Sequence, residues 1–152
     1  MYKTLIRPVL FKFNPEVAHN LTLNGLKVLR RIPFARNIVR LIYKREHPNL
    51  EREVFGIKFP NPVGLAGGLD KNGEVYNELS DFGFGFVEIG SLTAKPQPGN
   101  PKPRLFRVVK DKAIINRMGI NNHGVTQAIR NINSNHPRVI IAGNITPNSS
   151  SQ

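Results

Sequence analysis

The fold of this chain is decided by residues 61–73, which read Asn61-Pro62-Val63-Gly64-Leu65-Ala66-Gly67-Gly68-Leu69-Asp70-Lys71-Asn72-Gly73. Pro62–Ala66 is a short and wholly apolar run, which predicts a strand buried in a parallel sheet. The glycines after it form a turn into a predicted helix over Glu74–Phe82. Taken alone, Gly67–Lys71 is either an ordinary strand-to-helix turn or a loop whose backbone can approach a ligand closely.

Two further apolar strands are predicted downstream, at Phe86–Gly90 and Val139–Ala142, with a helix over His123–Asn133 before the second. The succession of strand, helix, strand, loop, helix and strand indicates parallel β/α units, so the predicted fold class is α/β. The other predicted elements are hairpins at Glu53–Phe59 and Leu105–Ile115 and a proline-rich loop over 94–103.

The composition excludes several classes of protein. The chain has 152 residues and no cysteine, which rules out disulfides, cysteine zinc sites, iron–sulfur clusters and thiol chemistry. No run approaches the ~20 apolar residues of a transmembrane helix, and the N-terminus lacks the apolar core of a secretory signal. We therefore expect an intracellular protein with one domain, or one domain and an appendage.

Positive charge is concentrated in the first third of the chain. Residues 1–52 carry eleven Lys and Arg against three acidic residues, a net charge of +8, whereas residues 53–152 carry +4. Such a segment attracts a polyanion, either nucleic acid or an anionic lipid surface. A third interpretation is a small helical domain whose apolar faces pack together and whose charges are solvated.

Apolar residues in this basic segment recur with helical spacing. They predict amphipathic helices over 2–13, 14–32 and 34–42, with a domain boundary near 46–52. The second helix should begin at Asn14-Pro15-Glu16, because Asn caps helix N-termini and Pro suits the first turn. Its main apolar stripe is predicted to be Val17, Leu21, Val28 and Ile32, widened by Ala18, Leu26 and Leu29.

Ligands of parallel β/α folds bind beyond the carboxyl ends of the strands. Gly67–Lys71, Gly90–Thr93 and Gly143-Asn144 occupy that position in the predicted sheet. Lys71 would offer a cation to a carboxylate, or to negative charge that develops on a heteroaromatic ring. The chain contains neither a Walker phosphate loop nor the dinucleotide pattern G-x-G-x-x-G.

Several strings together resemble the membrane-associated, quinone-using class 2 dihydroorotate dehydrogenases. The stretch 61–73 is similar to the first barrel strand and loop of that family, and Gly83–Thr93 to the second strand. The other matching strings are Asn14-Pro15-Glu16-Val17-Ala18-His19, Pro96–Arg107 and Ile115-Asn116-Arg117-Met118-Gly119-Ile120-Asn121-Asn122.

This resemblance implies an FMN-dependent (β/α)₈ TIM barrel preceded by a small α-helical, membrane-associating extension. Its implied activity is oxidation of dihydroorotate to orotate in pyrimidine biosynthesis, with quinone reoxidising the flavin. The implied FMN-binding residues are Gly67, Gly68, Leu69, Asp70, Lys71, Ser91 and Asn144. The implied substrate-binding residues are Lys71, Asn116, Arg117, Met118, Gly119 and Ile120, the last standing where the family usually has Phe.

The resemblance also gives the basic extension a role. His19 and Arg107 are similar to the polar pair that hydrogen-bonds the quinone head, although alone each would be interpreted as a solvated residue. The expected location is peripheral, on the cytoplasmic face of a bacterial-type inner membrane with an anionic surface. Neither nucleic acid nor a metal ion is expected as a partner.

The chain departs from the family pattern near its C-terminus. Asn144-Ile145 is followed directly by Thr146-Pro147, where the family normally continues with Gly-Lys-Asn. We therefore expect a quinone and membrane domain over 1–50, the first part of an incomplete FMN barrel over 51–145, and an atypical polar tail over 146–152. The serine base belongs to the missing half, so no catalytic residue is assigned and the chain as written is expected to be inactive.

Two alternatives to the quinone enzyme stay open on the sequence. One is a soluble FMN-barrel dehydrogenase of another class, against which the basic helical extension argues. The other is a non-catalytic fragment that binds membranes or other polyanions.

Overall fold

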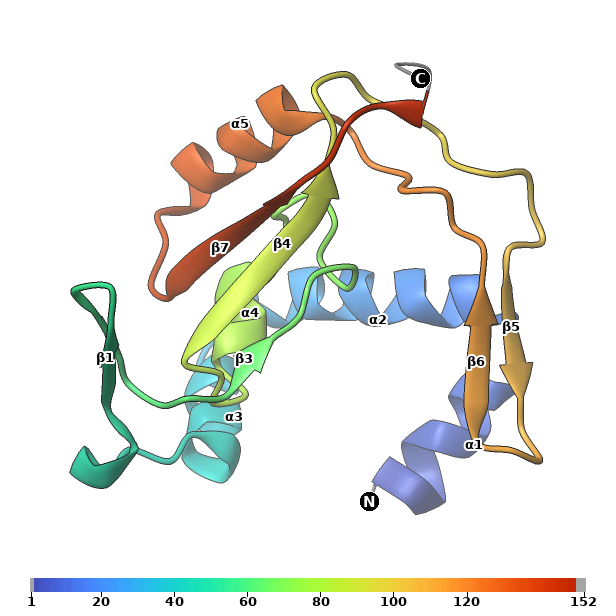
Figure 1. The fold of residues 1–152 in the computed structure, drawn as a ribbon. Helices are drawn as coiled ribbons and strands as arrows, with labels where there is room; N and C mark the ends of the chain where they lie inside the picture. The colour runs from blue at the N-terminus through green and yellow to red at the C-terminus, as the bar shows by residue number, and fades with distance from the viewer. Residues whose placement is uncertain (1, 150–152) are drawn as a thin grey trace.

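The first third of the chain is helical in the computed structural model, which describes residues 2–149 (Figure 1). The three predicted helices are confirmed, but the first is divided into two helix types. Pro8 lies in the first turn of the second piece, where its missing N–H costs nothing. The helical segments are the π-helix η1 (Tyr2–Ile6), α1 (Arg7–Phe11), α2 (Pro15–Leu29), α3 (Ala35–Tyr43) and the 3₁₀-helix η2 (Pro48–Leu50).

The centre of the fold is a parallel sheet in the order β3 (Gly64–Leu65), β4 (Phe86–Leu92), β7 (Ile140–Ile145). The three predicted strands are confirmed, although β3 is shorter than Pro62–Ala66. Pro62 has no N–H to donate, and the N–H of Val63 is bonded to the Asn61 side chain at 3.0 Å, so neither residue pairs with β4.

Helices α4 (Tyr76–Ser80) and α5 (Val125–Asn135) cover one face of this sheet. Val87 and Ile89 of β4 pack there and are 0–1% exposed, and fully burying a side chain of this size contributes about 1.5–3 kcal/mol. The other buried members of the core are Leu26, Val75, Tyr76, Leu79, Leu92 and Ala128.

Helix α4 is shorter than the predicted span Glu74–Phe82. The Asp70 carboxylate accepts hydrogen bonds from the backbone N–H groups of Glu74 and Val75, each at 2.8 Å. These residues therefore form a turn closed by a side chain, and the helix begins only at Tyr76.

The two predicted hairpins are confirmed as antiparallel pairs. One joins β1 (Arg52–Val54) to β2 (Ile57–Phe59), and the other joins β5 (Leu105–Val108) to β6 (Ala113–Asn116). Figure 1 shows α1 beside the β5–β6 hairpin, and α2 running from that hairpin toward α4. Helix α2 thus connects the two sides of the molecule.

The packing face of α2 differs from the predicted main stripe, but it contains residues that were predicted to widen that stripe. Ala18 and Leu26 are buried, because the side of α2 that meets α4 and β5 carries them. The predicted main stripe faces solvent, and many apolar side chains of the neighbouring helices are exposed too. The interpretation in which these apolar faces pack on one another is therefore wrong for residues 2–149. The exposed set is Leu5, Ile6, Val9, Phe11, Phe13, Val17, Leu21, Val28, Ile32, Phe34, Ile38, Leu41, Ile42 and Tyr43.

Helix α3 is attached to the core by buried ion pairs and by a contact between the rings of Tyr43 and Phe82, whose centroids lie 5.2 Å apart. The Asp81 carboxylate, 2% exposed, forms ion pairs with Arg36 and Arg40 of α3. Arg36 also donates to the backbone oxygen of Asn77 at 3.3 Å. The arginines that contribute to the positive charge of the segment thus include two that hold α3 in place.

Candidate functional site

A cavity of about 380 Å³ opens at the carboxyl ends of β3 and β4, where the sequence predicts the ligand. It gathers residues from four parts of the chain: α2, the loop after β3, the end of β4, and the β5–β6 hairpin with the loop that follows it. Polar groups of Lys71, Ser91 and Asn116 face a lining that is otherwise mostly apolar. The complete lining is His19, Gly68, Leu69, Lys71, Ser91, Leu105, Asn116, Met118 and Ile120.

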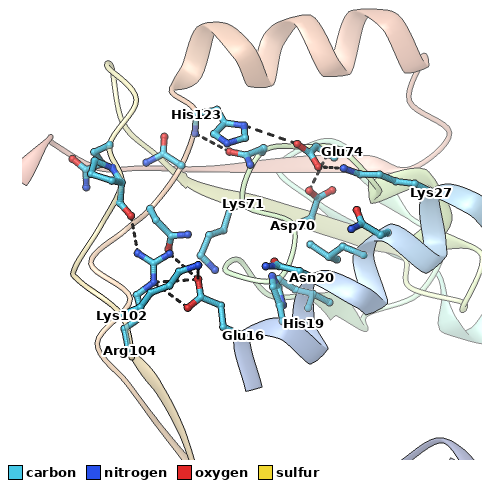
Figure 2. Close-up of a pocket in the computed structure, with 18 residues that line it drawn as sticks. Glu16, His19, Asn20, Lys27, Asp70, Lys71, Glu74, Lys102, Arg104 and His123 are labelled. Atoms are coloured by element: carbon cyan, nitrogen blue, oxygen red, sulfur yellow. Dashed lines mark hydrogen bonds and ion pairs between the residues drawn. The ribbon is translucent and has the colours of Figure 1, made fainter. Parts of the chain in front are cut away.

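A second, larger cavity of about 520 Å³ is also lined by Lys71 (Figure 2). His19, Leu69 and Lys71 line both cavities. The larger one is strongly polar, and the side-chain oxygen of Asn121 in its wall is buried without a hydrogen-bond partner among residues 2–149. An acceptor in that state is available to a ligand that carries an N–H or O–H group.

Lys71 is the cation shared by the two cavities. Its Nζ donates to the backbone oxygen of Gly68, which fixes the ammonium group above the glycine turn. Burial lowers the pKa of Lys71, and the positive charge of Arg104 lowers it further, while Glu16 opposes the change. Partial desolvation of this kind strengthens the attraction of a cation for an anionic ligand group.

The loop after β3 is tied to the end of β4 by its backbone. Gly68 N donates to Gly90 O at 2.7 Å, and Gly90 N donates to Asp70 O at 3.2 Å. The Asp70 carboxylate is committed to starting α4, and burial raises its pKa. Asp70, predicted as a cofactor residue, therefore shapes the loop with its side chain and does not line the smaller cavity.

Gly67 and Asn144, which are also predicted cofactor residues, both lie next to the side chain of Glu88. No role was predicted for Glu88 from the sequence. Asn144 Nδ2 donates to Glu88 Oε1 at 2.7 Å, and a Cβ on Gly67 would lie 2.9 Å from the same oxygen. Glu88 thus links β4 to β7 on the face of the sheet opposite Val87 and Ile89. A carboxylate in an otherwise apolar strand was the signal that could have identified it.

The predicted substrate loop, Asn116–Ile120, packs against the proline-rich loop. Asn100 N donates to Met118 O at 3.1 Å, and a Cβ on Gly119 would lie only 2.7 Å from Asn100 N. Ile120 follows with φ +54°, a left-handed conformation that is unfavourable for a β-branched residue. Strain of this kind is often found at ligand sites.

Within this loop the side chains diverge. Asn116, Met118 and Ile120 line the smaller cavity, whereas the Arg117 guanidinium donates to Pro103 O at 3.1 and 3.3 Å and does not reach it. Arg117 therefore holds the two loops together in this structure.

The predicted quinone pair is not brought together within residues 2–149. His19 lies beside Lys71, where burial lowers its pKa and the Lys71 charge adds to the effect. Arg107 instead donates to Phe13 O at 2.7 Å and Leu10 O at 3.2 Å, and it stacks on the Phe11 ring at 4.5 Å. Its groove, between α1 and the β5–β6 hairpin, is separate from the cavities around Lys71.

Glu16 and Arg104 form a buried ion pair in the wall of the larger cavity, with Nη2 of Arg104 2.8 Å from Oε1 of Glu16. No role in ligand binding was predicted for either residue. Within residues 2–149, no group of three or more His, Asp and Glu is placed to hold a metal ion.

The Glu16–Arg104 pair predicts how stability depends on acid. The hydrogen bond from Arg104 lowers the pKa of Glu16, so this carboxylate stabilises the fold above its unfolded pKa, near 4.5. That contribution disappears as the pH falls through the lowered value. Urea unfolding midpoints measured from pH 6 to pH 3 should therefore drop less steeply for Glu16→Gln than for wild type. Parallel curves would contradict this assignment.

Comparison with known proteins identifies the family. The family model described as dihydroorotate dehydrogenase matches residues 49–149, which include the cavity residues of β3, β4 and the substrate loop. This chain belongs to the dihydroorotate dehydrogenase family. The resemblance seen in the sequence is therefore confirmed, as is the α/β class of the fold.

Several curated relatives are named dihydroorotate dehydrogenase (quinone). The one from Christiangramia forsetii is 55% identical over 148 residues, which is 97% of this chain and 43% of the relative. The one from Methylococcus capsulatus is 46% identical, over 97% of this chain and 42% of its own length. The chain thus spans about two-fifths of the length of these relatives.

Among solved structures, the dihydroorotate dehydrogenase of Eimeria tenella in complex with ferulenol superposes with a TM-score of 0.75. It is 36% identical, and the match covers 91% of this chain and 37% of that one. The ligand-free structure of the Eimeria tenella enzyme gives a TM-score of 0.70, also at 36% identity.

Proposed function

We propose that this chain supplies the first part of a quinone-dependent dihydroorotate dehydrogenase, which oxidises dihydroorotate to orotate in pyrimidine biosynthesis. The observation that carries the proposal is the cavity where Lys71, Ser91 and Asn116 converge from three segments at the carboxyl ends of β3 and β4. Relatives named for this activity support it. In this proposal residues 51–145 are the beginning of a (β/α)₈ TIM barrel.

The smaller cavity fits the ring system of FMN, which we propose as the cofactor. Leu105, Met118 and Ile120 offer apolar surface to a planar ring, while Lys71 and Ser91 offer polar groups at its edge. Gly68 has φ +100° and open space where a Cβ would point, so the backbone leaves room for the ring. When bound, FMN would supply the hydride acceptor. Of the cofactor contacts implied by the resemblance, Gly68, Leu69, Lys71 and Ser91 line this cavity. Gly67, Asp70 and Asn144 remain proposed contacts, although they do not line it in this structure.

The same cavity offers groups suited to the substrate. The Asn116 amide can both donate to and accept from the imide edge of a pyrimidine. The Lys71 ammonium can balance the substrate carboxylate and the negative charge that develops during hydride transfer. No residue of this chain is assigned as the proton-accepting base. The proposed substrate contacts that line the cavity are Lys71, Asn116, Met118 and Ile120. Arg117 and Gly119 of the same loop are also proposed from the resemblance, although neither lines the cavity in this structure.

A chimaera tests the proposal directly. In it, residues 1–145 of this chain replace the corresponding part of the Christiangramia forsetii relative, which is 55% identical. We expect flavin absorbance in the purified chimaera and quinone reduction that depends on dihydroorotate. The 152-residue chain alone, with added FMN, is the control and should show no turnover. A folded, flavin-loaded chimaera that does not oxidise dihydroorotate would contradict the proposal.

Residues 1–50 form the proposed membrane and quinone domain. The exposed apolar side chains of α1, α2 and α3 lie among the basic residues that give this segment its positive charge, a combination suited to a membrane interface. None of the helices within residues 2–149 has the length and apolar character needed to cross a bilayer. We propose peripheral binding to the anionic cytoplasmic face of a bacterial-type inner membrane.

His19 and Arg107 remain the proposed contacts of the quinone head. For both to reach one ligand, Arg107 must exchange its bonds to the carbonyls of Leu10 and Phe13 for bonds to that ligand.

The proposed polar tail, 146–152, is partly described. Asn148 Nδ2 donates to Lys95 O at 2.8 Å, so the tail begins by packing on the loop after β4. Residues 150–152 lie outside the described residues.

The chain should bind anionic vesicles, and Leu41→Gln should weaken that binding about tenfold. Leu41 is 80% exposed on α3, so its contribution is available to the lipid. Vesicle sedimentation measures the partitioning, which should also weaken as salt screens the basic residues. Ile129→Gln, at a 51% exposed position on α5, is the matched control and should bind like wild type. Equal binding of wild type and Leu41→Gln would exclude α3 from the interface.

A further inference from the structure

Arg104 connects its own proline-rich loop to two other segments, the first turn of α2 and the loop that contains Met118. Its Nη2 donates to Glu16 Oε1 at 2.8 Å, which connects it to the first turn of α2. Its Nη1 donates to the carbonyls of Pro98 and Asn100 at 2.6 and 3.0 Å, and lies 3.5 Å from Met118 O. Arg104 is 6% exposed and Glu16 is 8% exposed, so water does not compete strongly for these bonds. Figure 2 shows the pair in the wall of the larger cavity.

Only arginine can make this set of contacts. Its planar guanidinium presents five N–H donors in a fixed arrangement, so one edge meets a carboxylate while the other reaches carbonyls. Lysine has a single nitrogen and cannot span Glu16 and the two loops together. These contacts therefore require the guanidinium group of Arg104, and a positive charge alone would not make them.

The two loops that Arg104 contacts already form one unit. Arg117 N donates to Arg104 O at 2.9 Å, and a Cβ on Gly99 would lie 2.2 Å from Met118 O. A movement of residues 97–104 must therefore move residues 116–120 as well. The second of these segments carries Asn116, Met118 and Ile120, which line the smaller cavity.

On the other side of the pair, Glu16 is held firmly. Its backbone N–H donates to the Asn14 side chain at 2.9 Å, the bond that caps α2. Glu16 also pairs with Lys102 at 3.3 Å, but the Lys102 side chain is 66% exposed, so that contact is screened by solvent. His19, one turn farther along α2, lines both cavities.

We propose that Glu16 and Arg104 are positioning residues, through which α2 holds the 116–120 loop in the conformation that its ligand needs. The helical segment of residues 1–50 would then stabilise the binding site in addition to contacting the membrane. The inference rests on the proposed function only for the identity of the ligand. The 116–120 loop and the Glu16–Arg104 pair that holds it are both part of this chain.

Hydrogen exchange of the 152-residue chain, measured by mass spectrometry without flavin or substrate, tests the proposal. Glu16→Gln keeps the side-chain volume but removes the charge. It should accelerate amide exchange about 100-fold in residues 97–104 and 116–122, because a broken buried pair leaves the guanidinium uncompensated. Exchange in β4, residues 86–92, should not change. Lys102→Ala is the matched control and should alter loop exchange less than about threefold.

Two conservative variants separate positioning from packing. Glu16→Asp keeps a carboxylate, so its loop exchange should return to within about tenfold of wild type. Arg104→Lys keeps the charge but loses the planar set of N–H donors, so its loop exchange should be accelerated as in Glu16→Gln.

Acceleration confined to α2, equal acceleration in the loops and β4, or an unchanged loop in Glu16→Gln would overturn the proposal. If Glu16→Gln does not fold, Arg104→Lys takes its place: faster exchange in the two loops with unchanged exchange in β4 supports the proposal, and equal change in both contradicts it. An inactive chimaera would affect only the proposed function, since exchange is measured without it.

Discussion

Replacing Lys71 with alanine in the chimaera should slow reduction of the flavin by dihydroorotate about 10²–10³-fold. That is the usual effect of removing one preorganised group that stabilises developing charge. Lys71 is suited to this role because it lines the cavity with Ser91 and Asn116 and is fixed by its bond to Gly68 O. Burial also lowers the pKa of this ammonium group.

Rapid mixing of oxidised chimaera with dihydroorotate, followed by flavin absorbance, measures this step apart from quinone reduction. Lys110→Ala is a suitable control, because Lys110 lies in the exposed turn between β5 and β6, away from the cavity. The control should reduce at the wild-type rate. A Lys71→Ala protein that binds flavin and is reduced as fast as the control would remove Lys71 from the reaction.

Asp81→Asn should be the most destabilising of the substitutions considered, with a loss of about 3–5 kcal/mol in the free energy of unfolding. Asp81 is 2% exposed and pairs with both Arg36 and Arg40. The Arg36 side chain is itself only 15% exposed, so the substitution leaves a buried guanidinium without its counter-charge. Urea unfolding followed by circular dichroism gives the midpoint and slope.

The control for this effect is another acidic residue paired with a cation in the same region. Glu46 pairs with Lys44 but its side chain is 70% exposed, so Glu46→Gln should leave the urea midpoint unchanged. If Asp81→Asn and Glu46→Gln had the same urea midpoint, α3 would be held by contacts other than the ion pairs of Asp81.

The sequence predicted the fold best where the local residue pattern alone determines the structure, as in the strands and turns of the parallel sheet. The apolar runs at 62–66, 86–90 and 139–142 lie in one parallel sheet, and the glycines after the first run form the predicted turn. The position of Lys71 and Ser91 in a common cavity followed from the rule that parallel strands end at one edge.

Contacts between distant segments could not be predicted in this way. The stripe of α2 was assigned from spacing alone, but which face is buried depends on where α4 and β5 lie. Helix α4 begins late because the Asp70 side chain replaces its first turn. Glu88 and Arg104 were missed for the same reason, since each acts through residues 56 and 88 positions away.

The contact between Gly67 and Glu88 constrains how this sheet can evolve. The Glu88 carboxylate is held by Asn144, so it cannot swing aside freely for a methyl group 2.9 Å away. A mutation from glycine at 67 would displace Glu88 and release Asn144, whereas a shorter residue at 88 would first make room for it. Mutations at the two positions should therefore be epistatic, and the order in which they arise should decide which evolutionary paths are open.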